Sequence, residues 1–366
     1  MSVVEDRVQP GSVGAKRPIR IFRNPMAKIA SIPMILTAMV VFVGGTLWTI
    51  VHSFSGSKLL PKLNWVGFDQ YERLWDTPRW LISISNLALY GICSLILTLT
   101  IGFVLAALLD RKIRGEGVFR TIFLYPFALS FVVTGIAWQW ILNPDFGLQN
   151  LVREWGWTSF TFNPLNDPNT VMFGLLIAGI WQGSGLIMCI MLAGLRGIDE
   201  DIWKAAKVDG IGTVKTYVRI VIPMMRPVFI TSLVLIASGI IKLYDLVVAQ
   251  TNGGPGISSE VPAKYVIEYM FRAQNLGQGF AASTMMLVSV VIILIPWAYL
   301  EFGKGMRIMH FLGVIALVLL TLAGVVAVVV AWSFSLSLLL PLIGFLICAG
   351  ALTVYLRFVK GHMQHG

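Results

Sequence analysis

Long apolar runs, separated by short polar segments, recur along the whole chain of 366 residues. Each run is long enough to cross the hydrocarbon core of a bilayer, about 30 Å thick, as an α-helix. The pattern therefore predicts an all-α polytopic membrane protein with about eight transmembrane helices. We expect the spans at Ile29–Val51, Ile82–Leu109, Phe119–Leu142, Val171–Leu195, Val228–Ala249, Phe280–Leu300, Phe311–Ala331 and Leu338–Tyr355.

The amino-acid composition supports a membrane protein and argues against nucleic-acid binding and metal binding. The chain is 57% hydrophobic and only 13% charged, too few charges to cover the surface of a soluble domain of this length. The net charge of +10 is typical of membrane proteins that collect Lys and Arg in cytoplasmic loops, so we expect no nucleic-acid partner. Cys93, Cys189 and Cys348 lie inside apolar runs, and the histidines do not cluster with acids. We therefore expect no disulfide and no metal site.

The positions of the basic residues predict the orientation in the membrane. Lys and Arg gather before the first span, after the eighth span, and in the loops after the second, fourth and sixth spans. The other loops are longer and rich in Trp, Asn, Pro and Gly. Cytoplasmic loops carry an excess of Lys and Arg, so both termini and the basic loops should be cytoplasmic. Residues 1–28 then form a cytoplasmic N-terminal tail.

The basic loop at residues 196–226 is longer than a helix connection requires. Its first part predicts a short helix, with Asp199 as a possible cap and with the helix formers Ala205 and Ala206 inside it. Gly210 is well placed to end this helix in a left-handed conformation. This part of the loop should present small side chains that another surface can approach closely.

A second short helix should follow in the same loop. Thr213 can cap it, and Pro223 and Pro227 should bend the chain into the fifth span. An apolar stripe is expected at helical spacing, formed by Val214, Tyr217, Val218 and Val221. From the residues alone, this loop either docks on a soluble protein or lies on the membrane surface as an amphipathic element.

The spacing within this loop resembles a known signature. Lys204-Ala205-Ala206 is followed by three residues and Gly210, and then by nine residues and Ile220-Val221-Ile222-Pro223. This resembles the coupling loop of binding-protein-dependent ABC import permeases, which reads Glu-Ala-Ala, three residues, Gly, nine residues, Ile-x-Leu-Pro; Asp209 also fits. Lys204 departs from the pattern, because it reverses the charge of the usual glutamate. Ile222 in place of leucine is a minor change.

Three further stretches extend the resemblance. They are Ser85–Tyr90, Phe119–Asn150 and Lys242–Gly256, and the last resembles the sugar branch of the family with its Thr-Asn-Gly-Gly-Pro run. The similarity covers residues 29–302 and is closest to the larger, maltose-type membrane subunit of carbohydrate importers. It implies a six-span permease core with a coupling loop at 196–226. Residues 303–366 fall outside the pattern and are interpreted as an additional C-terminal hairpin and tail.

The resemblance also implies the partners and the energy source. A permease of this kind lies in the bacterial inner membrane and assembles with a second permease subunit, a dimer of ATP-binding cassette ATPases and an extracytoplasmic solute-binding protein. ATP and Mg²⁺ are then used by the ATPase and not by this chain. The sequence agrees, because it contains no G-x-x-x-x-G-K-[ST] motif and no constellation of catalytic residues. We expect a transport subunit and not an enzyme.

Ionisable groups inside the membrane are costly and are therefore candidates for the solute pathway. Lys242 and Asp245 stand three apart in the fifth span and could pair on one helix face. Polar and aromatic side chains that suit a sugar are expected at a similar depth, namely Asn86, Trp138, Gln139, Trp181, Gln182 and Tyr244. The alternatives are a structural ion pair and ordinary packing between helices. Gly179 and Gly183 form a G-x-x-x-G that favours close helix contact.

The expected solute is a sugar, with an α-glucoside or glucose as examples. Two other interpretations remain at this point. One is an importer of a related solute such as a polyol or glycerol phosphate. The other is an ion-coupled secondary transporter, which would need broken helices and an ion site.

The predicted orientation can be tested by labelling. A cysteine at Ser258 should react with a membrane-impermeant thiol reagent in intact cells, because loop 251–279 should face outward. A cysteine at Thr213 should react only after the membrane is permeabilised. The opposite pattern would reverse the orientation.

Overall fold

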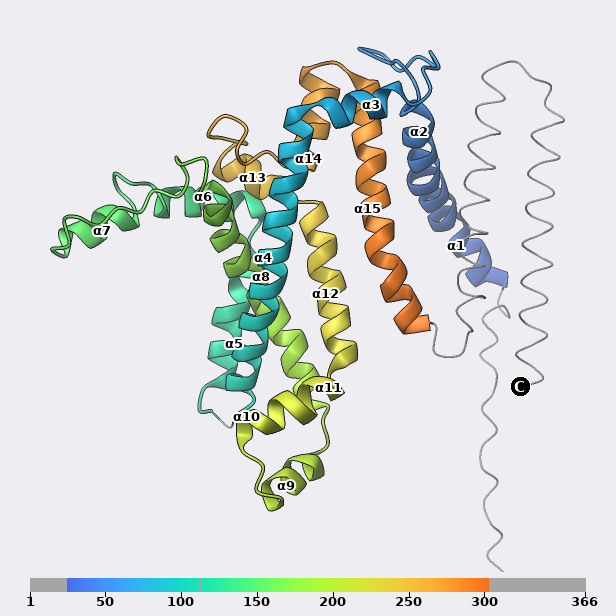
Figure 1. The fold of residues 1–366 in the computed structure, drawn as a ribbon. Helices are drawn as coiled ribbons and strands as arrows, with labels where there is room; N and C mark the ends of the chain where they lie inside the picture. The colour runs from blue at the N-terminus through green and yellow to red at the C-terminus, as the bar shows by residue number, and fades with distance from the viewer. Residues whose placement is uncertain (1–24, 112, 303–366) are drawn as a thin grey trace, which may run out of the picture. The chain divides into compact units, whose positions relative to one another are not determined.

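The computed structural model describes residues 25–111 and 113–302 (Figure 1). Every named element in this range is a helix, as expected for an all-α membrane protein. The predicted spans at Phe311–Ala331 and Leu338–Tyr355, and most of the N-terminal tail, lie outside the described residues. The chain divides into two units, residues 1–46 and residues 47–366.

The described helices of the first unit are α1 (Pro25–Ala38) and the π-helix η1 (Met39–Gly44), and α2 (Gly45–His52) begins at its end. Together they make one continuous helical run, of which Ser31–His52 is long and apolar enough to cross a membrane. Large apolar side chains along it, such as Phe42, are exposed. This agrees with the first predicted span.

Two long straight helices form the centre of the second unit. They are α4 (Pro78–Leu109) and α8 (Val171–Arg196), and both are long and apolar enough to span a membrane. Their contact depends on small residues. A Cβ on Gly102 of α4 would clash with the Ile187 side chain of α8, and a Cβ on Gly179 of α8 would clash with the Tyr90 hydroxyl. The close helix contact predicted for Gly179 is therefore present.

The third predicted span is sharply bent. It consists of α5 (Glu116–Leu124), the 3₁₀-helix η2 (Tyr125–Ala128) and α6 (Phe131–Ile141), with an angle of 100° across the break. The expectation of one continuous helix over Phe119–Leu142 was wrong. Leu129 and Ser130 are extended, and the Ser130 hydroxyl caps α6 by accepting a hydrogen bond from the Val133 amide. Pro126 in η2 has no amide proton to continue the helical ladder.

The fifth predicted span is also interrupted. α12 (Arg226–Ile241) ends at Lys242, and α13 (Asp245–Gln250) starts a separate short helix after Tyr244. The expectation of a continuous helix over Val228–Ala249 was therefore wrong. Tyr244 has φ −138° and ψ −62°, which no α-helical residue adopts. Asp245 then lies in the first turn of the new helix, where a carboxylate is favoured by the helix dipole.

The chain enters α12 through the expected bend. α10 (Thr213–Thr216), the π-helix η3 (Tyr217–Val221) and α11 (Ile222–Met224) meet α12 at 73°. Pro223 and Pro227 lie on either side of this bend, as predicted. Thr213 does not cap α10, because Gly212 is the cap residue and no side chain bonds there.

Of the remaining elements, α9 (Glu200–Val208) lies at one end of the second unit and most of the others lie at the opposite end, from which one long helix runs back along the bundle (Figure 1). α15 (Leu276–Phe302) contains the sixth predicted span, and it packs against α3 (Asp69–Asp76) and α14 (Pro262–Ile267). The π-helix η4 (Glu268–Arg272) follows α14, and α7 (Leu148–Glu154) lies in the loop after α6. We refer below to the two ends as the α9 end and the α14 end.

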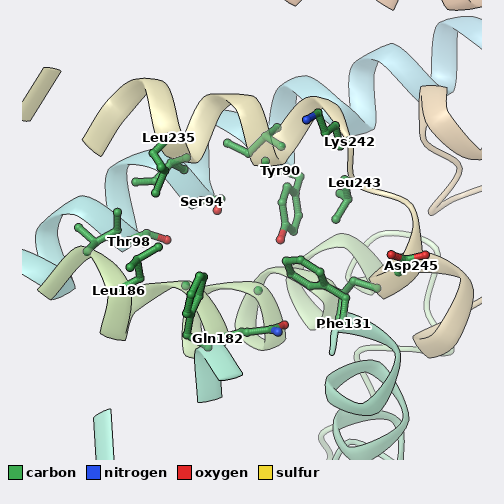
Figure 2. A pocket seen from close by; sticks show the side chains of 18 of the residues that line it. Tyr90, Ser94, Thr98, Phe131, Gln182, Leu186, Leu235, Lys242, Leu243 and Asp245 are labelled. Carbon is green, nitrogen blue, oxygen red and sulfur yellow. The ribbon is translucent and has the colours of Figure 1, made fainter. Parts of the chain in front are cut away.

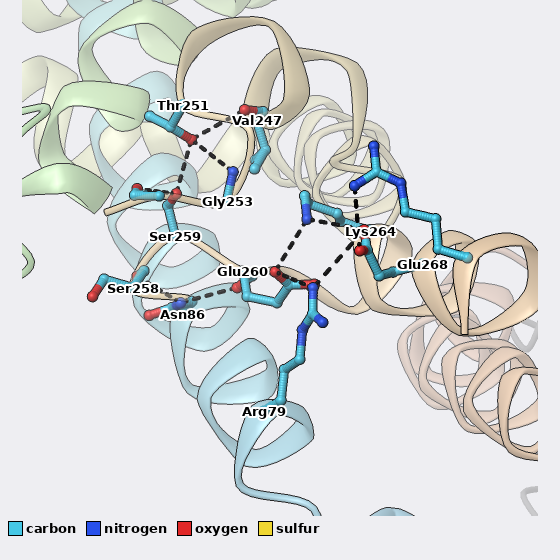
Figure 3. A network of polar contacts seen from close by, with 12 residues as sticks. Arg79, Asn86, Val247, Thr251, Gly253, Ser258, Ser259, Glu260, Lys264 and Glu268 are labelled. Atoms are coloured by element: carbon cyan, nitrogen blue, oxygen red, sulfur yellow. Dashed lines mark hydrogen bonds and ion pairs between the residues drawn. The ribbon is translucent and has the colours of Figure 1, made fainter. Parts of the chain in front are cut away.

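A network of charges fixes the loop between α13 and α14 (Figure 3). The Glu260 carboxylate is 1% exposed and pairs with Arg79 of α4 at 3.1 Å and with Lys264 of α14 at 3.3 Å. Glu268 joins the network through Lys264 at 3.5 Å and through Arg272 at 3.4 Å. The network joins the start of α4 to a loop much later in the chain, because Arg79 and Glu260 are 181 residues apart.

Removing one partner from this network should destabilise the α14 end. Glu260→Ala leaves Lys264 buried without its nearest carboxylate, and breaking a buried ion pair in this way costs about 3–5 kcal/mol. Arg272→Ala is the matched control, because its side chain is 72% exposed and an exposed pair contributes about 0–1 kcal/mol. Thermal unfolding of the purified chain in detergent measures both. Equal melting temperatures for the two variants would show that the network carries no stability.

Candidate functional site

A cavity lies between the central helices of the second unit (Figure 2). Its volume is about 800 Å³, including the part that opens to solvent. Its walls come from α4, η2, α6, α8, α12 and α13 and from the break between α12 and α13. The polar lining residues are Tyr90, Ser94, Thr98, Gln182, Lys242, Tyr244 and Asp245. Apolar residues such as Phe131 and Leu186 supply most of the remaining surface.

One wall of the cavity is a polar stripe on α4. Tyr90, Ser94 and Thr98 are spaced by four residues, so they lie on one face of the helix. The same face makes the close contact with α8, because Gly179 and Gly183 lie opposite Tyr90 and Thr98. The sequence analysis missed these three residues. Their signal was the four-residue spacing of hydroxyl side chains within an otherwise apolar helix.

Gln182 of α8 has two different roles. Its side-chain amide Nε2 donates a hydrogen bond to the carbonyl oxygen of Leu129 at 2.7 Å, which holds α8 against the break before α6. Its Oε1 is buried and accepts no hydrogen bond from the residues that the structure describes. Gln182 is 3% exposed and is one of the residues that line the cavity. Its role in a solute pathway stays a prediction.

Lys242, Tyr244 and Asp245 line the cavity at the break between α12 and α13, and Figure 2 labels Lys242 and Asp245 there. They do not form the arrangement expected from the sequence. Lys242 ends α12 and Asp245 starts α13, so they do not share one helix face. No ion pair joins them among those of the described chain. Instead, the break exposes both charges at the cavity, where an unpaired charge is retained for function more often than for stability.

The other predicted pathway residues lie elsewhere. The Asn86 amide donates to the carbonyl oxygens of Ser258 and Glu260 at 2.8 and 2.9 Å, so it fastens the loop after α13. Trp138 and Trp181 pack edge to face with ring centroids 5.9 Å apart, and neither lines the cavity. Gln139 lines a second, separate pocket at the α14 end. The structure thus brings together Gln182, Lys242, Tyr244 and Asp245 but not Asn86, Trp138, Gln139 or Trp181.

The loop at 196–226 has the predicted first helix. The Asp199 carboxylate caps α9 by accepting a hydrogen bond from the Asp201 amide at 2.9 Å. Gly210 has φ +67°, and the Gly210 and Ile211 amides bond back to the carbonyls of Lys207 and Ala206 at 3.2 and 2.9 Å. These two bonds form a Schellman motif, in which a left-handed residue closes the helix. The predicted stop at Gly210 is confirmed.

The second half of the loop has an inner and an outer side. Tyr217 packs against Trp203 of α9 with ring centroids 5.3 Å apart, and Val221 is fully buried. Val214 and Val218 are 77% and 58% exposed, so the predicted stripe is split between the core and the surface. The outer side of α9 is exposed as well, at Ala205 and Val208, whereas Ala206 is buried. The loop therefore has a packed inner side and an outer surface of small and apolar groups.

Two basic residues of this loop, Lys204 and Arg196, pair with neighbouring acids. Lys204 Nζ lies 2.9 Å from Asp201 and 4.0 Å from Glu200, and all three side chains are exposed, so these pairs contribute little stability. Arg196 links the end of α8 to the α4–α5 connection, with Glu116 at 2.8 Å and Asp110 at 3.8 Å. Burial raises the pKa of the Asp110 carboxyl, and the Arg196 guanidinium opposes this rise. The α9 end is thus braced beneath the exposed loop surface.

A polar cavity between bent and interrupted membrane helices is the arrangement of a permease and not that of a membrane anchor. Comparison with known proteins agrees with this class. Residues 98–359 match the family described as the binding-protein-dependent transport system inner membrane component, and the chain belongs to this family. The match includes part of residues 303–366, whose separation as an additional hairpin stays a prediction.

Several curated proteins are similar over most of their length. A probable ABC transporter permease protein of Pyrococcus horikoshii is 34% identical over 75% of this chain and 94% of its own. The xylose/arabinose import permease protein XacH of Haloferax volcanii is 29% identical, covering 80% and 94%. The trehalose/maltose transport system permease protein MalF of Thermococcus litoralis is 27% identical, covering 75% and 92%.

The fold also matches a solved structure. The crystal structure of a bacterial ABC transporter involved in the import of the acidic polysaccharide alginate has a chain that aligns with a TM-score of 0.65. That alignment covers 77% of this chain and 96% of the other, at 18% identity. Together the comparisons identify an ABC importer permease for a sugar or a related solute, embedded in the membrane as a transport subunit.

The cavity assignment predicts different effects for two buried amides. Gln182→Leu removes the unpartnered oxygen of a cavity-lining residue together with the bond to Leu129, and it should lower the uptake rate per molecule of inserted permease about three- to tenfold, the effect of one lost hydrogen bond to the solute. Asn86→Leu removes bonds within the protein only, so it should lower the abundance of folded permease instead. Uptake normalised to the amount of inserted protein separates the two effects. Normal uptake per molecule for Gln182→Leu would remove Gln182 from the pathway.

Proposed function

We propose that this chain carries a sugar across the bacterial inner membrane by alternating access, driven by ATP hydrolysis on a separate ATPase dimer. The ATPase would bind ATP and Mg²⁺, and this chain would bind neither. In this mechanism the ATPase dimer closes when it binds ATP, and the permease transmits the closure to its membrane helices. The cavity between α4, α8, α12 and α13 then opens to the outer side.

The observation that carries the proposal is the construction of the coupling loop, residues 196–226. Its inner side is packed against the bundle, because Tyr217 contacts Phe103 of α4 with ring centroids 6.1 Å apart and buried Val221 belongs to the same core cluster as Met191 of α8. Its outer side presents Ala205, Val208 and Val214 to solvent. A rigid element that pushes on the bundle needs a firm inner contact, and a docking surface needs small or apolar exposed groups.

The loop is also connected directly to the cavity. Its second half continues through η3 and α11 into α12 across the 73° bend, and α12 ends at the break that presents Lys242 and Asp245. A displacement of the coupling loop would therefore move a wall of the cavity. This connection supports a mechanism in which a partner acts on the loop and the solute responds at the break.

The further partners in the proposal are a second permease subunit and an extracytoplasmic solute-binding protein. One crystal structure similar in fold shows a bacterial alginate ABC transporter in complex with an alginate pentasaccharide-bound periplasmic protein. In this chain the corresponding contact would use the loops at the α14 end, which the Glu260 network holds in place. The predicted orientation places that end outside the cytoplasm.

The proposed solute is a neutral sugar such as an α-glucoside or glucose. The aromatic, amide, hydroxyl and carboxylate groups of the cavity supply the mixture that sugar rings and hydroxyls bind. One observation favours a second candidate, a phosphorylated polyol. Lys242 presents a cation to the cavity, and the sn-glycerol-3-phosphate transport system permease protein UgpA of Pectobacterium atrosepticum is 25% identical to this chain.

The docking role of the coupling loop can be tested at Gly210. Gly210 is exposed, and no atom lies within 4 Å of a Cβ placed there. Gly210→Trp should place a bulky group on the docking surface and strain the left-handed backbone by about 1–2 kcal/mol. Insertion should be normal, whereas co-purification of the ATPase, sugar uptake and ATP hydrolysis stimulated by the binding protein should fall together.

The matched control is Gly115→Trp. Gly115 is also left-handed, with φ +83°, is equally open, and lies in the α4–α5 connection at the α9 end. It carries the same backbone strain without altering the coupling loop. If Gly210→Trp behaves like Gly115→Trp, with ATPase binding and uptake retained, the loop is not the coupling element.

A further inference from the structure

A second pocket lies at the α14 end of the bundle, beyond the central cavity. Six of the residues that line it carry a side-chain amide or hydroxyl, and we call it the amide pocket. These residues are Gln139, Asn143, Asn163, Asn166, Gln250 and Thr251. The remaining lining is leucine, proline and glycine, and no charged or aromatic side chain contributes.

The amide pocket is built by contacts that hold its walls in place. Gln149 joins the two sides of the loop between α6 and α8, because its Nε2 donates to the Pro144 carbonyl at 3.3 Å and its Oε1 accepts from the Phe162 amide at 2.7 Å. Gln250 Nε2 donates to the Gly174 carbonyl at 3.2 Å, which fixes the end of α13 to α8. The pocket is therefore a formed site and not a gap between mobile loops.

Two carbonyl oxygens of these walls have no donor. Gln250 is 1% exposed, and its Oε1 accepts no hydrogen bond from the described residues. The same holds for the buried Oδ1 of Asn163. A buried amide oxygen is almost always satisfied, and a donor that reaches these two from the pocket, such as a ligand hydroxyl or a water molecule, would complete their bonding.

The chemistry of the lining selects the class of ligand. Amides offer both donors and acceptors, which match the hydroxyl groups of a sugar, and the leucine and proline side chains suit its C–H surfaces. The lining contains no Lys or Arg that could compensate a phosphate or carboxylate. The amide pocket thus differs from the central cavity, which presents Lys242 and Asp245.

The two sites lie at opposite ends of the same pair of helices. α6 contributes Phe131 to the central cavity and Gln139 to the amide pocket, and α13 contributes Asp245 to the former and Gln250 to the latter. Between the two sites the helices are in tight contact, since a Cβ on Gly135 of α6 would lie 2.7 Å from the Ala249 Cβ of α13. Separation of α6 from α13 at this contact would join the two sites.

We propose that the amide pocket is an entrance subsite for a neutral, polyhydroxylated solute, occupied before the solute passes between α6 and α13 into the central cavity. The inference rests on the proposed sugar transport, and it adds a second binding site and a preference against anionic solutes at the entrance. Gln250 and Asn163 supply the acceptor oxygens of this subsite.

The test measures protection of a cysteine by sugar. Asn166 lines the pocket and is exposed, so Asn166→Cys is placed in the full chain with Cys93, Cys189 and Cys348 replaced by serine. The probe is whichever of glucose, maltose, trehalose and xylose the intact importer takes up fastest in cells. This sugar should slow maleimide labelling of the purified permease in a saturable way, and glycerol 3-phosphate should not.

Two variants locate the effect. Gln250→Leu should raise the sugar concentration for half protection about three- to tenfold, as expected for one lost hydrogen bond. Gln182→Leu is the matched control, because Gln182 is also buried, also donates one bond to a backbone carbonyl and also has an unpartnered Oε1, but faces the central cavity. It should leave protection at Asn166→Cys unchanged. If Gln250→Leu does not fold, Asn163→Ala should show the same shift.

The outcomes separate this inference from the proposed function. The subsite is overturned if no transported sugar slows the labelling, or if glycerol 3-phosphate slows it equally. In either case, uptake of the sugar by the importer would still support the proposed function. An equal loss of protection in Gln182→Leu and Gln250→Leu also overturns it. If none of the four sugars is taken up but one of them protects Asn166→Cys, the subsite stands and the proposed transport of sugar fails.

Discussion

The close contact between α4 and α8 is the constraint on which the rest of the structure depends. Two helices in lipid gain no hydrophobic stabilisation when they associate, because lipid tails are as apolar as their side chains. Their association relies instead on close van der Waals contact, which small residues allow. Gly179 faces Tyr90 and Gly102 faces Ile187 at this contact. Because the polar stripe of α4 lies on the same face, the glycines that bring the helices together also bring Tyr90, Ser94 and Thr98 to the cavity wall.

The two helix breaks follow from what the cavity requires. An unbroken helix satisfies its own backbone and presents only side chains, whereas a break exposes helix ends and can aim charged groups inward. The break at residues 242–244 does this for Lys242 and Asp245, and the break before α6 is held by Gln182 through the Leu129 carbonyl. The Asn86 amide fastens such a segment, and the Gln182 and Gln250 side chains each combine one fastening bond with an oxygen that accepts none from the described residues.

Local signals in the sequence predicted local structure well. The long helices α4 and α8, the Asp199 cap, the left-handed stop at Gly210 and the bend beside Pro223 all depend on neighbouring residues, and all are present. The failures involve contacts between distant residues. Phe119–Leu142 is mostly apolar on both sides of its break, so hydropathy alone could not place that interruption. At the other break the charges of Lys242 and Asp245 were a signal, but they were interpreted as a pair on one helix face. Likewise, Arg79 pairs with Glu260, and Asn86 bonds to Ser258, which is 172 residues later in the chain. Neither partner could be identified from neighbouring residues.

In the proposed mechanism the cavity opens alternately to the two sides under control of the ATPase. Ser94 lines the cavity on α4, and Ser94→Cys changes one atom, so its reactivity reports access without altering the wall. In membrane vesicles that contain the assembled importer with its other cysteines replaced, an impermeant thiol reagent applied from the outer side should label Ser94→Cys only when vanadate traps the ATPase in its closed state. Applied from the cytoplasmic side, it should label only in the absence of nucleotide. Labelling from either side that does not change with the state of the ATPase would contradict the account.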